Sequence, residues 1–326
     1  MTGKTLEVLG IGNAIVDIIS QSDDAFLEKH GMPKGGMALI DEGAADTLYD
    51  AMGPAIEASG GSAGNTIAGV ASLGGRAGYI GKVRDDAFGR IFRHDLQSLG
   101  VRYETAPQAD GPSTARCLVL VTPDAQRTMN TYLGACVNLT PDDIDEELVA
   151  SAAITYLEGY LFDPPQAKEA FRKAARIARQ SGGKVALSLS DSFCVHRYRD
   201  EFREFVRDHI DILFANEEEI KALYEQETVE AAAALAAKDA DLAVLTLGAK
   251  GSLLIRGEEQ VKVVPAPVER VIDTTGAGDL YAAGVLFGLS RGKPLAECGR
   301  YGSIAAGEII SHYGARPETS LAELIA

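Results

Sequence analysis

Short apolar runs alternate with longer amphipathic segments along most of this sequence. Runs with strand-like patterns occupy residues 6–19, 77–80, 154–157, 185–189, 210–214 and 243–246. Segments with helical patterns fill residues 63–73, 88–99 and 165–180. Strands that alternate with helices in this way form β-α-β units, in which successive strands are parallel. The pattern therefore predicts an α/β fold with a largely parallel central sheet and helices on both of its faces.

Two stretches, roughly residues 13–50 and 101–137, interrupt this alternation. Within the second stretch, residues 116–121 and 127–132 have strand-like patterns on either side of a Pro-Asp turn. We expect the two stretches to pair into a small β-sheet outside the main body. The sequence contains no linker that would divide the chain, so we predict a single domain over residues 1–326 with this sheet inserted.

Composition and charge narrow the classes of protein and partner. The chain is 46% apolar and 24% charged, which is typical of a globular protein and excludes disordered and coiled-coil classes. Its formal net charge of −16 repels nucleic acids and anionic membrane surfaces, so neither is expected as a partner. A nucleotide is still compatible with this charge, because the amides at a helix N-terminus can bind its phosphates locally.

The spacing of the cysteines and histidines argues against disulfide and zinc sites. Cys117, Cys136, Cys194 and Cys298 are far apart and form no C-x-x-C pair, and the five histidines are scattered. This spacing favours free thiols in a reducing compartment. No apolar run reaches membrane-spanning length, and the N-terminus leads directly into a strand-like pattern. A cytoplasmic protein is therefore predicted.

The most informative motif is the heptapeptide DTTGAGD at residues 273–279, which an apolar segment of helical length follows directly. Glycines let backbone amides approach a ligand closely, and a helix N-terminus favours anions. The amides of Gly276, Ala277 and Gly278 would therefore suit a phosphoryl group in transit. Asp279 would lie in the first helical turn, where it can accept a proton from a hydroxyl group. Asp and Gly at this place also serve as an ordinary helix cap, which needs no ligand.

This heptapeptide resembles the C-terminal signature of the ribokinase (PfkB) family of carbohydrate and nucleoside kinases. The sequence GGSAGN at residues 60–65, followed by Gly74 and Gly75, resembles the N-terminal signature of the same family. The two motifs occur in the family's order, and the resemblance extends over nearly the whole chain. It implies a ribokinase-like fold, in which helices sandwich a parallel-rich sheet and a small β-sheet lid closes over the substrate to exclude water.

The resemblance also implies roles in phosphoryl transfer. It makes Asp279 the catalytic base, the amides of Gly276, Ala277 and Gly278 the anion hole, and Arg127 a contact of the transferred phosphoryl group. ATP is the implied phosphoryl donor and Mg²⁺ the implied metal. The residues implied to bind ATP are Asn216, Glu219, Thr246, Gly248 and Gly251. Glu219 would hold Mg²⁺ through water, and the family further suggests K⁺ near Asp273 and the backbone of residues 309–314.

The same residues also have structural interpretations that require no ligand. Asn216 and Glu219 stand three positions apart, so they can form a capping box at the start of a helix. The segment from Thr246 to Gly251 has the pattern of a tight turn. An arginine such as Arg127 on an exposed strand is usually solvated.

The resemblance implies that the acceptor substrate binds to a carboxylate and in an apolar slot. Asp17 lies within an apolar strand, where aspartate is uncommon, and would accept hydrogen bonds from two sugar hydroxyls beside Gly61 and Asn65. Within the family the chain is most similar to the adenosine kinases, in runs such as GYL at residues 159–161 and DILFANE at residues 211–217. The slot for a purine ring would consist of Met37, Leu133, Leu161 and Phe193, although such residues more often belong to a core.

Glu158 departs from the adenosine kinase pattern. It stands where animal adenosine kinases have a small apolar residue and where ribokinase-like sugar kinases can have a substrate-binding acid. The leading hypothesis is phosphorylation of the hydroxymethyl group of adenosine to give AMP. The alternatives are a sugar or sugar-phosphate kinase with the same machinery and a catalytically silent nucleoside-binding protein, against which an intact Asp279 argues. The sequence leaves open whether the chain is a monomer or a homodimer.

Overall fold

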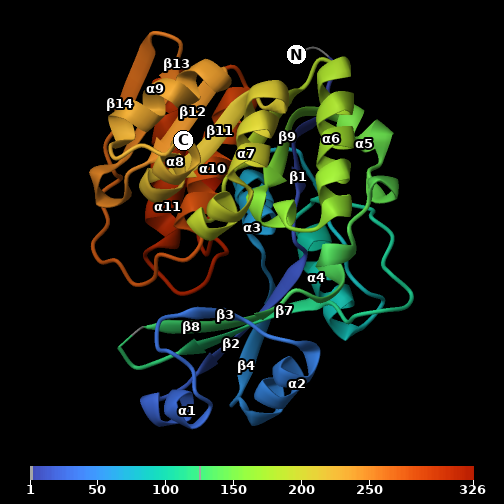
Figure 1. The fold of residues 1–326 in the computed structure, drawn as a ribbon. Helices are drawn as coiled ribbons and strands as arrows, with labels where there is room; N and C mark the ends of the chain where they lie inside the picture. The colour runs from blue at the N-terminus through green and yellow to red at the C-terminus, as the bar shows by residue number, and fades with distance from the viewer. Residues whose placement is uncertain (1–2, 125) are drawn as a thin grey trace.

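The computed structural model describes residues 3–124 and 126–326 of the 326-residue chain. Residues 1, 2 and 125, which fall within the predicted domain and lid, lie outside the described residues. Within the described residues the strands form a nine-stranded sheet and a separate five-stranded sheet. Figure 1 shows the larger sheet surrounded by helices, with the smaller sheet beneath it. This arrangement is the predicted α/β fold with a second small sheet.

The nine-stranded sheet is parallel except at one edge. In spatial order its strands are β14 (Glu259–Val263), β13 (Ser252–Arg256), β12 (Leu242–Thr246), β11 (Ile212–Asn216), β10 (Lys184–Ser188), β9 (Ala152–Glu158), β1 (Leu6–Ile11), β5 (Ala77–Ile80) and β6 (Arg102–Tyr103). Only the pairs of β13 with β12 and with β14 are antiparallel in this sheet. The carboxyl ends of the parallel strands therefore meet at a common edge, where α/β proteins place their ligands.

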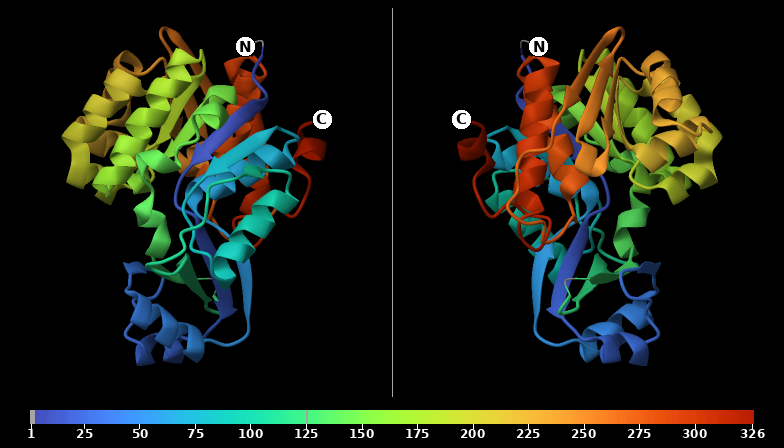
Figure 2. Two further views of the ribbon diagram at one scale, coloured as in Figure 1. Left: turned by 90° about the vertical axis from the view of Figure 1, so that its right-hand side faces the viewer. Right: turned by 90° about the vertical axis from the view of Figure 1, so that its left-hand side faces the viewer.

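Two layers of helices cover this sheet (Figures 1 and 2). One layer contains α3 (Ser62–Ser72), α4 (Ala87–Ser98), α10 (Ala277–Ser290), α11 (Leu295–Ile309) and α12 (Leu321–Ile325). The other contains α5 (Glu146–Ser151), α6 (Pro165–Gln180), α7 (Ser192–His209), α8 (Glu217–Tyr224) and α9 (Val229–Asp239). Because successive strand residues point to opposite faces, Val8 packs into the first core and Leu9 into the second. The helices predicted over residues 63–73, 88–99 and 165–180 are confirmed.

The smaller sheet has the strand order β3-β8-β7-β2-β4. Its strands are β2 (Ile15–Gln21), β3 (Met37–Leu39), β4 (Ala55–Ser59), β7 (Ala115–Val121) and β8 (Arg127–Tyr132). The predicted hairpin is present, because β7 and β8 pair antiparallel. The helices α1 (Asp24–Lys29) and α2 (Glu42–Ala51) fall between strands of this sheet in the chain. Short 3₁₀ helices complete the chain: η1 (Gly134–Asn138), η2 (Pro141–Asp143), η3 (Gly159–Phe162) and η4 (Gly248–Lys250).

The structure corrects the predicted elements at three places. The strand predicted over residues 6–19 is two strands, because β1 ends in the large sheet at Ile11 and β2 begins in the small sheet at Ile15. Strand β4 extends the small sheet beyond the predicted range of 13–50 by pairing antiparallel with β2. Strand β6 lies within the predicted range of 101–137 but pairs with β5 in the large sheet.

Helices α3 and α10 pack closely and bring their N-termini together. A methyl group at Gly69 of α3 would lie 2.6 Å from the Leu280 side chain and 2.7 Å from Ala283, both on α10. The missing side chain at Gly69 therefore permits this close approach. Both N-termini lie at the edge of the large sheet that faces the small sheet (Figure 1). None of the helices in the described part of the chain is both long enough and apolar enough to cross a membrane.

Candidate active site

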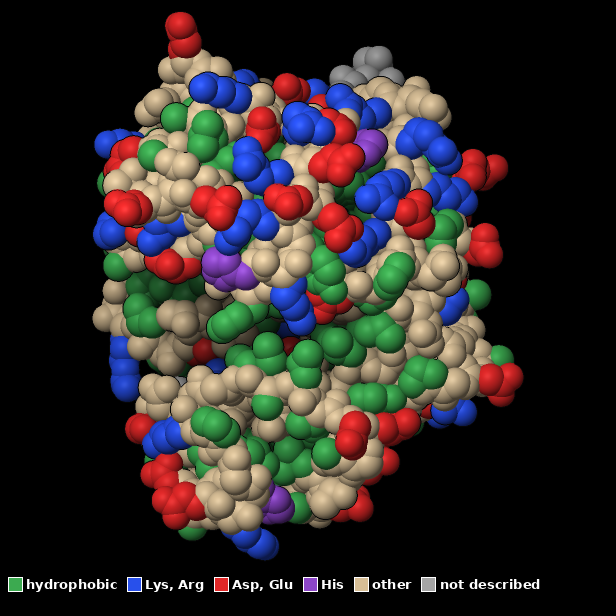
Figure 3. Space-filling view, in the orientation of Figure 1, with side chains coloured by type: hydrophobic (Ala, Val, Ile, Leu, Met, Phe, Trp, Pro, Cys, Tyr) green, Lys and Arg blue, Asp and Glu red, His purple; other side chains and the backbone are tan. Residues whose placement is uncertain are grey.

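A cleft of about 1010 Å³ separates the two sheets. The small sheet contributes Asp17, Cys117 and Met129 to its lining, and the large body contributes Glu219 and Asp279. In the space-filling view, hydrophobic side chains gather along the groove between the two parts of the molecule (Figure 3). A concave site with an apolar rim and a few convergent charged groups is typical of small-molecule binding.

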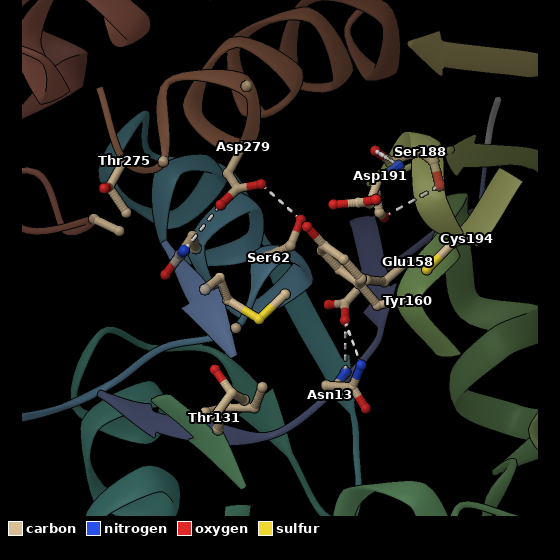
Figure 4. Close-up of a pocket in the computed structure, with 18 of the residues that line it drawn as sticks. Asn13, Ser62, Thr131, Glu158, Tyr160, Ser188, Asp191, Cys194, Thr275 and Asp279 are labelled. Atoms are coloured by element: carbon tan, nitrogen blue, oxygen red, sulfur yellow. Dashed lines mark hydrogen bonds between the residues drawn. The ribbon is translucent and has the colours of Figure 1, made fainter. Parts of the chain in front are cut away.

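Asp279 lies where the N-termini of α3 and α10 converge. Its carboxylate accepts hydrogen bonds from Ser62 Oγ at 2.6 Å and from Asn65 Nδ2 at 2.9 Å (Figure 4). Gly276 precedes α10 with a φ of +77°, a conformation that glycine adopts without strain. A side chain at Gly276 would also meet Ala315 at 2.9 Å. The turn therefore depends on glycine, and it leads directly into the helix that carries Asp279.

Burial raises the pKa values of several carboxylates in the cleft, Asp279 and Asp17 among them. Burial raises the pKa of Asp279 above its ordinary value, while hydrogen bonds from Ser62 and Asn65 and the charge of Arg316 act in the opposite direction. Burial raises the pKa of Asp17 to about 6, opposed mainly by Arg316. Asp17 accepts no hydrogen bond from the residues that the structure describes. A carboxylate that lines a cleft without a protein partner is suited to bind a ligand.

Glu158, at the end of β9, joins the link between β1 and β2 to the start of α3. Its carboxylate accepts hydrogen bonds from Asn13 Nδ2 at 2.8 Å, from Asn13 N at 3.3 Å and from Ala63 N at 2.8 Å (Figure 4). The residue is 1% exposed, and burial raises its pKa to about 7. Both carboxylate oxygens are engaged by the protein, so Glu158 fixes the N-terminus of α3. A contact between Glu158 and a substrate stays a prediction.

Arg127 and Asp273 form an ion pair at the edge of the cleft. Arg127 Nη1 lies 2.5 Å from Asp273 Oδ2, and both side chains are buried. The interpretation of Arg127 as a solvated arginine is therefore wrong. Asp273 also accepts hydrogen bonds from Thr275 N and Gly314 N. Donors thus contact both of its oxygens, and a role of Asp273 as a K⁺ ligand stays a prediction.

Asn216 and Glu219 form a capping box at the start of α8. Asn216 Oδ1 accepts from Glu219 N at 2.8 Å, and the Glu219 carboxylate accepts from Asn216 N at 2.9 Å and from Asn216 Nδ2 at 2.7 Å. The capping interpretation is therefore confirmed. Both residues also line the cleft, and burial raises the pKa of Glu219 to about 7. A cap of this kind leaves room for a ligand role, because carboxylate oxygens accept more than one hydrogen bond.

A family model for the pfkB family carbohydrate kinases matches residues 56–321. The chain belongs to this family. As a pfkB kinase it is a phosphotransferase that acts on an alcohol group, with ATP as co-substrate. The matched region contains both helices whose N-termini meet at Asp279.

Solved and curated relatives agree with this assignment. The crystal structure of adenosine kinase from Sinorhizobium meliloti is 56% identical, with a TM-score of 0.91 and 98% of each chain covered. A probable sugar kinase from Rhizobium etli is 50% identical, with a TM-score of 0.92 and 98% of each chain covered. The adenosine kinase of Saccharomyces cerevisiae is 26% identical over 89% of this chain and 91% of its own length.

The pfkB fold brings most of the predicted site residues into one cleft. Those that line it are Asp17, Met37, Gly61, Asn65, Arg127, Leu133, Glu158, Phe193, Asn216, Glu219, Thr246, Gly276, Gly278 and Asp279. Gly248 and Gly251 lie in the tight turn between β12 and β13, so the turn interpretation of this segment is confirmed. Leu161 is 1% exposed and packs in the second core, because η3 turns it inward. Its predicted place in the purine slot is therefore wrong.

Ser62, Asn13 and Arg316 belong to the site but were not predicted from the sequence. Ser62 lies inside the recognised GGSAGN motif, and its place at the first position of α3 was the available signal. Asn13 follows strand β1 closely, at a point where parallel strands carry ligand-binding side chains. Arg316 lies between α11 and α12 in a segment without periodic pattern, so no sequence signal indicated it.

Proposed function

We propose that this pfkB kinase transfers the γ-phosphoryl group of ATP to the 5′ hydroxyl of adenosine and so produces AMP. The observation that carries the proposal is the position of Asp279, at two converging helix N-termini in the same cleft as the unpartnered carboxylate of Asp17. The 56% identity with the adenosine kinase from Sinorhizobium meliloti supports adenosine as the acceptor. The four cysteines are free and buried, in keeping with the proposed cytoplasmic location.

The geometry of the cleft supports transfer by a single displacement. The 5′ oxygen forms a bond to the γ-phosphorus while the bond from that phosphorus to the bridging oxygen of ADP breaks. Asp279 accepts the hydroxyl proton, and ADP carries away the electron pair of the broken bond. The amides of Gly276 and Gly278 lie at the positive end of α10 and line the cleft, where they stabilise the charge on the transferring group. The Ala277 amide donates to Thr274 O at 3.2 Å and does not line the cleft, so its predicted part in the anion hole does not fit this arrangement. Arg127 lines the same cleft, but Asp273 offsets its charge, so contact with the transferring group would require Arg127 to exchange this partner for a phosphate.

The cleft also fits a magnesium ion held mainly through water and phosphate. No group of three or more metal-ligating side chains occurs among residues 3–124 and 126–326. Mg²⁺ commonly uses one or two protein carboxylates together with waters and substrate phosphates, so the Glu219 carboxylate with Asn216 is a sufficient donor set. When bound, the ion neutralises charge on the ATP phosphates. Glu219 and Asn216 would orient the water around it.

Replacing Glu219 with glutamine should raise the Mg²⁺ concentration needed for half-maximal rate by about tenfold, because a carboxylate that orients the metal's water is lost. Initial rates at fixed ATP across a magnesium titration measure this shift. Glutamine at position 219 can still complete the capping box with Asn216, so the melting temperature should change little. Glu218→Gln is the control, since Glu218 is an exposed neighbour on the first turn of α8. An unchanged magnesium titration with a lower melting temperature would mean that Glu219 is only a cap.

A sugar or sugar-phosphate acceptor is the second candidate, favoured by the likeness to the probable sugar kinase from Rhizobium etli. Glu158 is the residue that would contact such an acceptor, and its oxygens also accept from Asn13 and Ala63. A panel of adenosine, other nucleosides and free sugars, with detection of ADP, tests both candidates. Turnover of adenosine supports the proposal. Turnover of a sugar with adenosine inert as substrate and competitor would favour the second candidate, and binding without any turnover would favour a silent sensor.

Phe193→Ala should raise the KM for adenosine about two- to tenfold, because a purine that stacks on this ring would lose about 0.5–1.5 kcal/mol of aromatic contact. Phe193 is 76% exposed on the lining of the cleft, where it is free to meet a ligand. A lone sugar should be barely affected by the same change. Glu158→Gln is the paired variant and should weaken a sugar more than a nucleoside. If Phe193→Ala changed the KM for adenosine and for a sugar equally, Phe193 would not contact the purine.

A further inference from the structure

Arg316 reaches the active site from the loop between α11 and α12. Its Nη1 donates to Asn65 Oδ1 at 2.5 Å, and its Nη2 donates to Ser59 Oγ at 3.0 Å. Asn65 in turn donates to Asp279 Oδ2. A continuous chain of hydrogen bonds therefore runs from Arg316 through Asn65 to the proposed catalytic base.

The loop that carries Arg316 is anchored on both sides. Before Arg316, Gly314 N donates to Asp273 Oδ2 at 3.1 Å, and Ala315 packs against the Gly276 turn. After Arg316, the amides of Glu318 and Thr319 both donate to Glu308 Oε1 at 2.9 Å. The backbone on either side of Arg316 is thus held by the turn that begins α10 and by Glu308 of α11.

The donor and acceptor groups of Arg316, Asn65 and Asp279 require Asn65 to stand between the other two. A guanidinium group can only donate hydrogen bonds, and an ionised carboxylate can only accept them. The Asn65 carboxamide has both an oxygen and an amino group, so it can stand between Arg316 and Asp279. Because Arg316 binds the oxygen of Asn65, the amino group must face Asp279. Without Arg316 the carboxamide could rotate and present its oxygen to the carboxylate.

The positive charge of Arg316 also acts on the carboxylates of Asp279 and Asp17. It opposes the rise that burial causes in the pKa of Asp279 and of Asp17. Arg127 is paired with Asp273, whereas Arg316 forms no ion pair with the residues that the structure describes. Other titratable groups interact electrostatically with these three residues. Tyr79 on β5 and Asp95 on α4 act on Arg316, and Arg127 on β8 acts on Asp17. The charge of Asp279 in turn acts on Tyr156 and Glu158 on β9, Tyr160 on η3 and Glu219 on α8.

We propose that Arg316 is a positioning residue for phosphoryl transfer, which orients the Asn65 carboxamide toward Asp279 and supplies the positive charge that favours ionised Asp279. The inference rests on the proposed role of Asp279 as base. It assigns Arg316 no contact with the substrate, so its effect should appear in kcat and in the pH profile more than in the KM for ATP.

The first test compares Arg316→Gln with Arg316→Lys in the full chain. Arg316→Gln should lower kcat about 10- to 100-fold and move the acid limb of the kcat/KM profile about 0.5–1 pH unit higher, since the charge that favours ionised Asp279 is lost. Arg316→Lys should lower kcat too, because it lacks the planar fork, but its acid limb should stay near the wild-type position. Arg291→Gln is the matched control: Arg291 pairs with Glu7 away from the cleft, so this variant should lose stability and keep the wild-type pH profile.

The second test is a double-mutant cycle with Asn65→Ala, with kcat measured on the plateau of the pH profile. If Arg316 acts through Asn65, adding Arg316→Gln to Asn65→Ala should lower kcat by less than about threefold. A full additional loss would overturn the inference, as would an Arg316→Gln variant with a wild-type acid limb. The acceptor used is the one that the wild type phosphorylates in the substrate panel. A wild type without turnover of any acceptor would overturn the proposed function, whereas an active wild type with an indifferent Arg316 would overturn this inference alone.

Discussion

Asp279→Asn should lower kcat by ~10² to 10⁴ and leave the affinities for ATP and the acceptor nearly unchanged, because it removes a proton acceptor that acts in the transition state. The structure places the Asp279 carboxylate between Ser62 Oγ and Asn65 Nδ2 at the start of α10. Asparagine fills the same space but cannot take the proton. Steady-state kinetics together with ATP binding by calorimetry measure the two parts of this expectation.

The control for this variant must separate catalysis from a purely structural role of the carboxylate. Asp86→Asn changes an aspartate outside the cleft lining that caps α4 with one oxygen and accepts from Thr114 N at 2.8 Å with the other, a bond that the amino group of asparagine cannot replace. It should cost stability with little change in kcat. The Asp279 side chain does not cap α10, because its carboxylate accepts from Ser62 and Asn65 instead of from the amides of the helix. If Asp279→Asn kept kcat within a few fold of the wild type and lost only stability, Asp279 would join α3 to α10 and would not be the base.

Asp17→Ala should raise the KM of the acceptor about 10- to 150-fold, which corresponds to about 1.5–3 kcal/mol for hydrogen bonds to a charged group. Asp17 lies on β2 and faces the cleft with no hydrogen-bond partner among the residues that the structure describes. Its carboxylate is therefore free to accept hydrogen bonds from two hydroxyls of a ribose. The loss should appear for a nucleoside and for a sugar alike, so this variant tests the site and not the identity of the acceptor.

Asp46→Ala is a suitable control for Asp17→Ala. Asp46 on α2 pairs with Arg116 of β7 at 2.8 Å, and neither residue lines the cleft. Its loss removes one carboxylate near the small sheet without touching the proposed binding position, so the KM should not change. An Asp17→Ala variant with a wild-type KM would show that the acceptor is held elsewhere.

Much of the fold could be predicted from the sequence because its signals are local. The alternation of strand-like and helical segments predicted the parallel sheet, and helix α6 begins and ends at the predicted residues Pro165 and Gln180. The DTTGAGD heptapeptide likewise predicted a glycine turn at a helix start, with Asp279 in the first turn. Periodicity and capping act over a few residues, so a local pattern is enough to reveal them.

Only the tertiary structure decided which of these distant residues come into contact. Ser62 and Asp279 are 217 positions apart, and Asn65 and Arg316 are 251 positions apart, yet each pair is joined by a hydrogen bond. The burial of Leu161 was equally hidden, since an apolar residue beside a recognised motif suits a slot and a core alike. Contacts between distant segments depend on how whole helices and sheets pack, and that packing leaves no mark in the local pattern of the residues that it brings together.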